Sequence, residues 1–168
     1  MNSTDREYIP HSTGCFLCGD ENACGVRTKF YVEGDAVCTS IALPPYVNGY
    51  RNVAHGGVIA ALLDESMGWA ATVFGGLQRM YLTGELTVKY LAPVPVGEEI
   101  EVRSRLVEDA GRIAYGEGEL LCGGKVLVRA KGKFLPMSRE ATAAVIPYLK
   151  FGMCGKYRTL LDGAKEGN

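Results

Sequence analysis

The segment Asn52-Val-Ala-His55-Gly56-Gly57-Val58-Ile-Ala-Ala-Leu-Leu-Asp64-Glu65 joins a polar, glycine-rich loop to an apolar run that carries two acids. From Gly56 to Phe74 the apolar residues recur at helical spacing, and a glycine pair follows, so the sequence predicts a helix over 56–74. This helix is apolar on almost every side, which indicates that it is buried.

The start of this helix has the properties of a site for a ligand oxygen. The first N–H groups of a helix lack intrahelical partners, and the helix dipole makes that end positive. Gly57 has no side chain, so an oxygen can approach those groups closely. Asp64 lies nine residues after His55, roughly 13 Å of helical rise. An oxyanion site and a carboxylate on one short element suit acyl transfer.

Length and composition restrict the class of protein. A chain of 168 residues, nearly half of them apolar, predicts one folded domain, and a net charge of −1 argues against nucleic-acid or anionic-membrane binding. No unbroken run of about 18 apolar residues predicts a membrane span. The polar N-terminus, Met1 to Glu7, has no apolar signal-peptide core. We therefore expect a cytoplasmic protein whose six cysteines are free thiols or ligands.

The rest of the chain reads mainly as strands. We expect an irregular N-terminal arm over 1–25, a domain over 26–136 and a partly helical tail over 137–168 with a helix from Ala141 to about Phe151. Period-two alternation places Thr83, Glu85, Thr87 and Lys89 on one wet face. One helix covers only part of one sheet face, so a second copy is expected on the other. The predicted strands are 26–33, 36–43, 80–91, 98–107, 112–122 and 125–135, the last four forming an antiparallel meander.

This layout resembles the hotdog fold, an α+β fold in which a curved antiparallel sheet of about six strands surrounds one long central helix. The runs His55-Gly-Gly, Leu63-Asp64-Glu65 and Thr83 to Pro93 resemble the phenylacetate-type acyl-CoA thioesterases (PaaI-like). Cys15-Phe-Leu-Cys18-Gly19 resembles the N-terminal Cys-Phe-x-Cys-Gly arm of one branch of that family. The resemblance covers about residues 15–136.

The resemblance implies hydrolysis of an acyl-CoA thioester to a free acid and coenzyme A, without a cofactor or a metal. Asp64 would be the catalytic carboxylate, as nucleophile or as general base on water. The N–H of Gly57 or Gly56 would polarise the thioester carbonyl, and His55 would organise the loop. Thr83 falls where relatives carry a hydroxyl that reaches the site from the partner subunit. The protein would be a homodimer or homotetramer with sites at subunit interfaces.

One departure from the family pattern concerns the group that orients the substrate. Many relatives carry Asn or Gln six residues before the histidine, where this chain has Gly49. Asn48 and Asn52 are therefore the candidates for that role. Glu65 lies about 100° around the helix from Asp64 and is assigned to substrate contact or to a bond at the subunit interface.

Three other functions stay open at this point. A hotdog enoyl-CoA hydratase or dehydratase also pairs a histidine with an acid, and a non-catalytic acyl-CoA-binding protein would use the same fold. The third is an interaction protein stapled by zinc on the N-terminal arm, but irregular ligand spacing favours a packing role for those cysteines. The zinc ligands would be His11, Cys15, Cys18 and Cys24. The acyl group is not predicted: Trp69, Phe74, Met80 and Tyr81 fit an aromatic-accepting pocket or the core.

Overall fold

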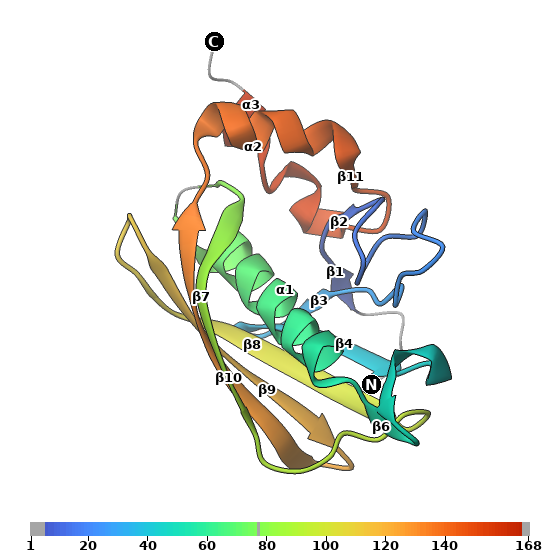
Figure 1. Cartoon of the computed structure of the whole chain (residues 1–168). Coiled ribbons are helices and arrows are strands. Elements are labelled where there is room, and N and C mark those ends of the chain that lie inside the picture. The colour runs from blue at the N-terminus through green and yellow to red at the C-terminus, as the bar shows by residue number, and fades with distance from the viewer. Residues whose placement is uncertain (1–5, 77, 166–168) are drawn as a thin grey trace.

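A curved antiparallel sheet surrounds one long helix in the computed structural model, which describes residues 6–76 and 78–165 (Figure 1). The helix is α1 (Gly56–Phe74), as the sequence predicts. The main sheet has seven strands in the order β1-β3-β4-β8-β9-β10-β7. Expectations about residues 1–5 and 166–168 lie outside the described residues. The strands are β1 (Glu7–Tyr8), β3 (Tyr31–Glu33), β4 (Ala36–Ala42), β7 (Tyr81–Tyr90), β8 (Glu99–Asp109), β9 (Ala114–Cys122) and β10 (Lys125–Pro136).

The core lies between α1 and the inner face of the sheet. By length and composition α1 is apolar enough to cross a membrane, but half of it is buried inside the fold. The close approach needs Gly118 on β9, because a Cβ there would lie 2.6 Å from Ser104 Oγ and 3.1 Å from Leu63 Cδ2. The buried residues of α1 are Ile59, Leu62, Leu63, Ser66, Met67, Trp69, Ala70, Ala71 and Thr72.

The predicted four-stranded meander is wrong in its strand order. β7 pairs with β10 at one edge of the sheet, and β8 pairs with β4 and β9. Residues 91–98 carry the chain between β7 and β8, and the Ala54 N–H donates to the Val94 carbonyl there at 2.9 Å. Alternation along a strand reveals its two faces but not its neighbours, which is why the sequence could not supply the order.

A bulge in β7 corrects the predicted position of Thr83. The pairing of β10 with β7 shifts between Lys133, which faces Glu85, and Phe134, which faces Thr83. An extra residue in one strand reverses the faces beyond it. Thr83 therefore points toward α1 instead of sharing the wet face of Glu85, and Leu82 is 59% exposed.

The outer face of the sheet is polar. Cations and anions pair across neighbouring strands, as in Arg129–Glu119 at 2.9 Å and Lys131–Glu117 at 2.7 Å. Such exposed pairs each contribute little to stability, but they leave the face compatible with water. This face therefore gives no reason to expect a second copy over it.

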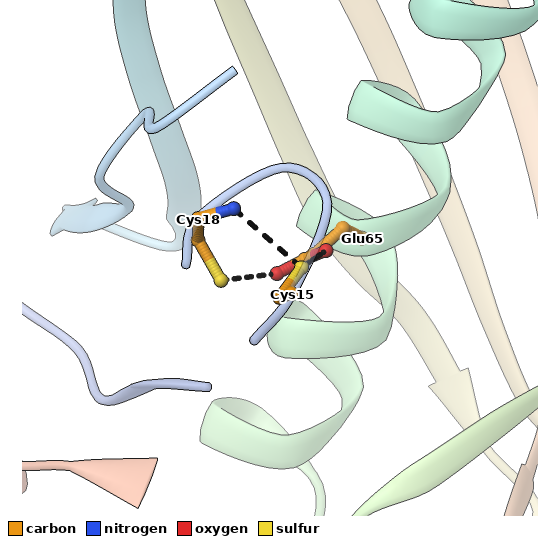
Figure 2. A group of neighbouring side chains, drawn as sticks. All are labelled: Cys15, Cys18 and Glu65. Atoms are coloured by element: carbon orange, nitrogen blue, oxygen red, sulfur yellow. Dashed lines mark hydrogen bonds between the residues drawn. The ribbon is translucent and has the colours of Figure 1, made fainter. Parts of the chain in front are cut away.

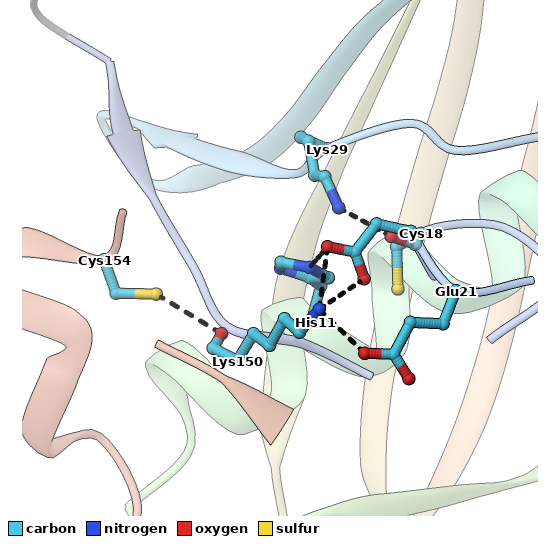
Figure 3. Close-up of polar contacts among 7 residues, drawn as sticks. His11, Cys18, Glu21, Lys29, Lys150 and Cys154 are labelled. Carbon is cyan, nitrogen blue, oxygen red and sulfur yellow. Dashed lines mark hydrogen bonds and ion pairs between the residues drawn. The ribbon is translucent and has the colours of Figure 1, made fainter. Parts of the chain in front are cut away.

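The N-terminal arm and the C-terminal tail pack together beside α1. β2 (His11–Ser12) pairs with β11 (Leu149–Lys150) in a separate two-stranded sheet. Lys150 Nζ contacts Asp20 at 3.1 Å and Glu21 at 2.9 Å (Figure 3). The predicted helix over 141–151 is shorter, since α2 (Arg139–Val145) gives way to a 3-10 turn containing Pro147, which has no N–H to donate. The remaining elements are η2 (Pro45–Val47), β5 (Asn48–Tyr50), β6 (Val53–Ala54), η3 (Ile146–Tyr148), η4 (Gly155–Thr159) and α3 (Asp162–Lys165).

Candidate active site

Asp64 and Thr83 meet between the middle of α1 and the start of β7. Thr83 Oγ1 donates a hydrogen bond to Asp64 Oδ1 at 2.7 Å. Burial raises the pKa of Asp64 above its usual range, and the Thr83 hydrogen bond lowers it in part. The two residues belong to one chain, so this contact does not need the partner subunit that the family resemblance implies for Thr83.

A pocket of about 240 Å³ opens beside Asp64. Met80 lies in the pocket wall, and its N–H donates to Thr142 Oγ1 of α2 at 3.2 Å, so the tail forms part of the enclosure. Phe74, predicted with the other aromatic candidates, is not among the lining residues. The lining consists of Ser12, Cys15, Asp64, Glu65, Gly68, Trp69, Thr72, Met80, Tyr81, Thr83, Phe134, Val145 and Leu149.

The start of α1 is capped by its own chain. The Gly57 N–H donates to His55 Nδ1 at 3.0 Å, and the N–H groups of Val58 and Ile59 donate to the His55 carbonyl at 3.0 and 3.2 Å. His55 is thus the N-cap residue of α1. A substrate oxygen can use the Gly57 N–H only if the His55 ring turns away.

The helix start is also far from the carboxylate. Gly57 and Asp64 are seven residues apart on α1, roughly 10 Å along the axis. An oxyanion donor must lie about 3 Å from the reacting oxygen, and a nucleophile or base must reach the same carbonyl group. Gly57 and Asp64 of one chain therefore cannot act on one carbonyl, which corrects the simple sequence-based arrangement.

The other predicted binding residues lie around the helix start. The Gly56 carbonyl accepts a hydrogen bond from Tyr90 Oη at 2.6 Å, and Tyr90 is a contact that sequence reasoning missed. Asn48 is exposed on β5 and pairs with Ala54 of β6. Asn52 has φ 62°, a left-handed conformation that asparagine tolerates, so its place in the tight turn accounts for its residue type.

Glu65 has partners in the N-terminal arm. Cys15 Sγ lies 2.9 Å from Glu65 Oε2, and Cys18 Sγ lies 2.8 Å from Oε1 (Figure 2). Burial raises the pKa of Glu65 to about 8, whereas the hydrogen bond from the Cys18 thiol lowers the pKa of Cys15 to about 5. His11 and Cys24, expected beside these cysteines, lie elsewhere: His11 pairs with Asp20 at 3.6 Å, and Cys24 is exposed.

The sheet, the central helix and this site define a hotdog-fold protein of the α+β class. Residues 51–128 match the model of the Thioesterase superfamily. The acyl-coenzyme A thioesterase THEM4 of Xenopus laevis is 35% identical over 99 residues, 57% of this chain and 43% of that protein. An uncharacterised protein of Schizosaccharomyces pombe is 32% identical over 74 residues, 44% of this chain and 41% of that protein. The chain thus spans less than half the length of these relatives.

Solved structures agree with the fold. The thioesterase superfamily protein RHA08564 superposes with a TM-score of 0.66 and 28% identity, over 73% of this chain and 60% of that one. The Escherichia coli PaaI protein from the phenylacetic acid degradation operon gives a TM-score of 0.62 at 14% identity, over 71% of this chain and 86% of that one. At that identity, the second likeness concerns the fold alone.

Proposed function

We propose that this protein hydrolyses acyl-CoA thioesters to a free acid and coenzyme A, with Asp64 as the catalytic carboxylate. The observation that carries the proposal is the half-buried Asp64, held by Thr83 at 2.7 Å on the wall of a pocket. The match to the Thioesterase superfamily model and the likeness to an acyl-CoA thioesterase support the same reaction.

The proposed chemistry needs one ionised carboxylate and one donor for the carbonyl oxygen. Asp64 either attacks the thioester carbon, forming an anhydride that water then opens, or removes a proton from an attacking water. In both cases the carbon–sulfur bond breaks, and coenzyme A leaves as a thiolate that takes up a proton. General base catalysis contributes a factor of about 10²–10⁴, and one oxyanion donor about 3–4 kcal/mol. Thioesters are already activated, so these groups can suffice.

The proposed active unit is a homodimer whose site combines two chains. Gly57 and Asp64 of one chain are too far apart, so Asp64 would face Gly57 of the partner subunit. β7 offers a surface for such pairing, because it is the edge strand of the sheet and runs over ten residues. Leu82 and Tyr90 on this strand are 59% and 48% exposed. A long, exposed edge strand is a ready template for pairing with another chain.

The pocket beside Asp64 would take the acyl group. Its volume of about 240 Å³ is below the 300–1,000 Å³ of sites that enclose a drug-sized ligand, so the coenzyme A portion would lie outside it. Trp69, Met80 and Tyr81 in the lining suit an apolar or aromatic acyl chain. All six cysteines are free thiols, which supports the proposed location in the reducing cytoplasm.

A panel of acyl-CoAs tests this function. Released coenzyme A is measured with a thiol-trapping dye on aliphatic and aryl substrates, and enoyl-CoA hydration is followed in parallel. Thiol release from at least one substrate class is expected, without hydration. Hydration without thiol release would establish the hydratase alternative, and tight binding without turnover would establish an acyl-CoA-binding protein.

Subunit complementation tests the shared site. A mixture of Asp64→Asn chains with Gly57→Pro chains, which lack the N–H at that position, should recover activity if each site uses one residue from each chain. If the mixture stays as inactive as the two single variants although mixed dimers form, the two-chain arrangement is contradicted.

A further inference from the structure

Cys15, Cys18 and Glu65 form a compact cluster that the proposed hydrolysis does not use. The two cysteines lie in the N-terminal arm, and Glu65 projects from the middle of α1 (Figure 2). Their two sulfurs and a carboxylate oxygen all lie within 4.8 Å of one another. Segments about 50 residues apart thus bring together three side chains of the types that bind metal ions.

The backbone of the arm is shaped around the first cysteine. The N–H groups of Leu17 and Cys18 point at Cys15 Sγ, at 3.2 and 3.5 Å. Backbone donors directed at a sulfur stabilise the thiolate form that a metal ion requires. Gly19 closes the turn, and a Cβ at that position would lie 2.5 Å from the carbonyl oxygens of Thr13 and Cys15. The sequence Cys15-Phe-Leu-Cys18-Gly19 therefore builds a tight loop with both sulfurs on one side.

The charge of the cluster suits exchange of protons for a dication. With two of the three groups protonated, the cluster carries one negative charge. A divalent cation that displaces both protons leaves the same charge of −1, with two protons released to solvent. The adjacent Lys29 amine donates a hydrogen bond to the Cys18 carbonyl at 2.8 Å (Figure 3).

We propose that Cys15, Cys18 and Glu65 bind a zinc ion that fastens the N-terminal arm to α1. Two thiolates and a carboxylate favour zinc over hard cations such as magnesium or calcium. Cys15 and Glu65 also line the pocket that contains Asp64, so the arm forms one wall of the proposed acyl site. The binding of zinc does not depend on the thioesterase activity, and its test does not use that activity.

This site differs from the one the sequence indicates. Cysteine spacing alone groups Cys15 and Cys18 with Cys24 and His11, and that pattern is irregular. The structure replaces those two residues by Glu65, which no local spacing connects to the arm. A four-coordinate zinc with three protein ligands keeps one position for water or another small ligand.

The test is the zinc content of protein purified with a reductant from zinc-supplemented cells. One zinc per chain is expected for the wild type and for Cys24→Ser, which alters an exposed cysteine outside the cluster. Cys18→Ser should weaken zinc binding, measured by competition with a chromophoric chelator, by more than the roughly 10–100-fold typical of changes outside the ligand shell. Glu65→Gln should weaken it as well.

Cobalt titration of the metal-free wild type keeps the proposal testable if a variant does not fold. A thiolate-to-cobalt charge-transfer band that saturates at one equivalent is expected, together with loss of two reactive thiols. Wild-type protein that takes up neither zinc nor cobalt would overturn the proposal. A Cys15–Cys18 disulfide in the reduced preparation, or equal loss of zinc from Cys24→Ser and Cys18→Ser, would overturn it too.

Discussion

Replacing Thr83 by valine removes one hydroxyl from the Asp64 carboxylate and changes little else. Thr83 Oγ1 is 2.7 Å from Asp64 Oδ1, and valine has nearly the same shape as threonine. Because burial already raises the pKa of Asp64, loss of this donor should raise it further. Asp64 must be ionised to act as a nucleophile or as a base. As the pH is lowered, the variant should therefore lose its activity at a higher pH than the wild type does.

The size of the shift follows from the hydrogen bond. A hydrogen bond to a charged group contributes about 1.5–3 kcal/mol, and 1.36 kcal/mol corresponds to one pKa unit. At a pH on the acid side of the profile, the full loss would therefore lower the ionised fraction of Asp64, and with it kcat/KM, by about 10–100-fold. Thr83 is exposed, so water replaces part of the lost interaction, and we expect a decrease near the lower end, about 10-fold.

The assay is the pH dependence of kcat/KM for thiol release from one acyl-CoA. Two variants serve as controls: Thr83→Ser keeps the hydroxyl, and Thr87→Val alters the same strand on its outward face. The acid limb of the pH profile, where kcat/KM falls as the pH is lowered, should move to higher pH for Thr83→Val alone. An acid limb that stays in place in Thr83→Val, with activity retained, would refute the idea that Thr83 tunes a catalytic Asp64.

Three further predictions concern stability. Gly118→Ala should lower the free energy of unfolding by about 1–3 kcal/mol in a urea titration, because its Cβ would lie 2.6 Å from Ser104 Oγ; an unchanged value would contradict the close packing of α1 on β9. His55→Ala should cost about 1 kcal/mol through loss of the helix cap, and an unaltered urea midpoint would show that the His55–Gly57 bond has no net effect. Burial raises the pKa of Asp64 in the folded protein above the ordinary value of 3.8, so the folded state binds more protons than the unfolded state. The stability of the wild type should therefore fall as the pH rises from 3.8 through the raised pKa. Asp64→Asn should lack this loss and match or exceed the wild type at neutral pH in thermal melts, and a clearly less stable variant would disagree.

Local patterns predict the helix and the strands β4 and β7 to β10, but they start the strand at β3 (Tyr31–Glu33) too early, at residue 26, and miss β1 (Glu7–Tyr8). A 3.6-residue apolar period and the following glycines predict α1 with the bounds that the structure gives. Strand order was not readable, because alternation in β7 and β8 is the same whichever strands they pair with. The sequence therefore predicted a meander where β7 instead lies at the far edge, next to β10.

The site was predictable only where it follows from one element. The position of Asp64 on an apolar helix and the family resemblance together assign it to the site. Alternation places Thr83 on the wet face, because a one-residue bulge is invisible in that pattern, and only the resemblance assigns Thr83 to the site. The contact of Glu65 with Cys15 and Cys18 joins segments about 50 residues apart, so no local spacing reveals it. Capping of Gly57 by His55 also depends on side-chain geometry.

The most direct test of the account is kcat for acyl-CoA hydrolysis by Asp64→Asn. The asparagine fills the same space beside Thr83 but can neither attack the thioester nor accept a proton from water. We predict a loss of at least about 10²-fold in kcat, with a circular dichroism spectrum and oligomeric state equal to those of the wild type. Hydrolysis at close to the wild-type rate by a correctly folded Asp64→Asn protein would contradict the assignment of Asp64 as the catalytic carboxylate.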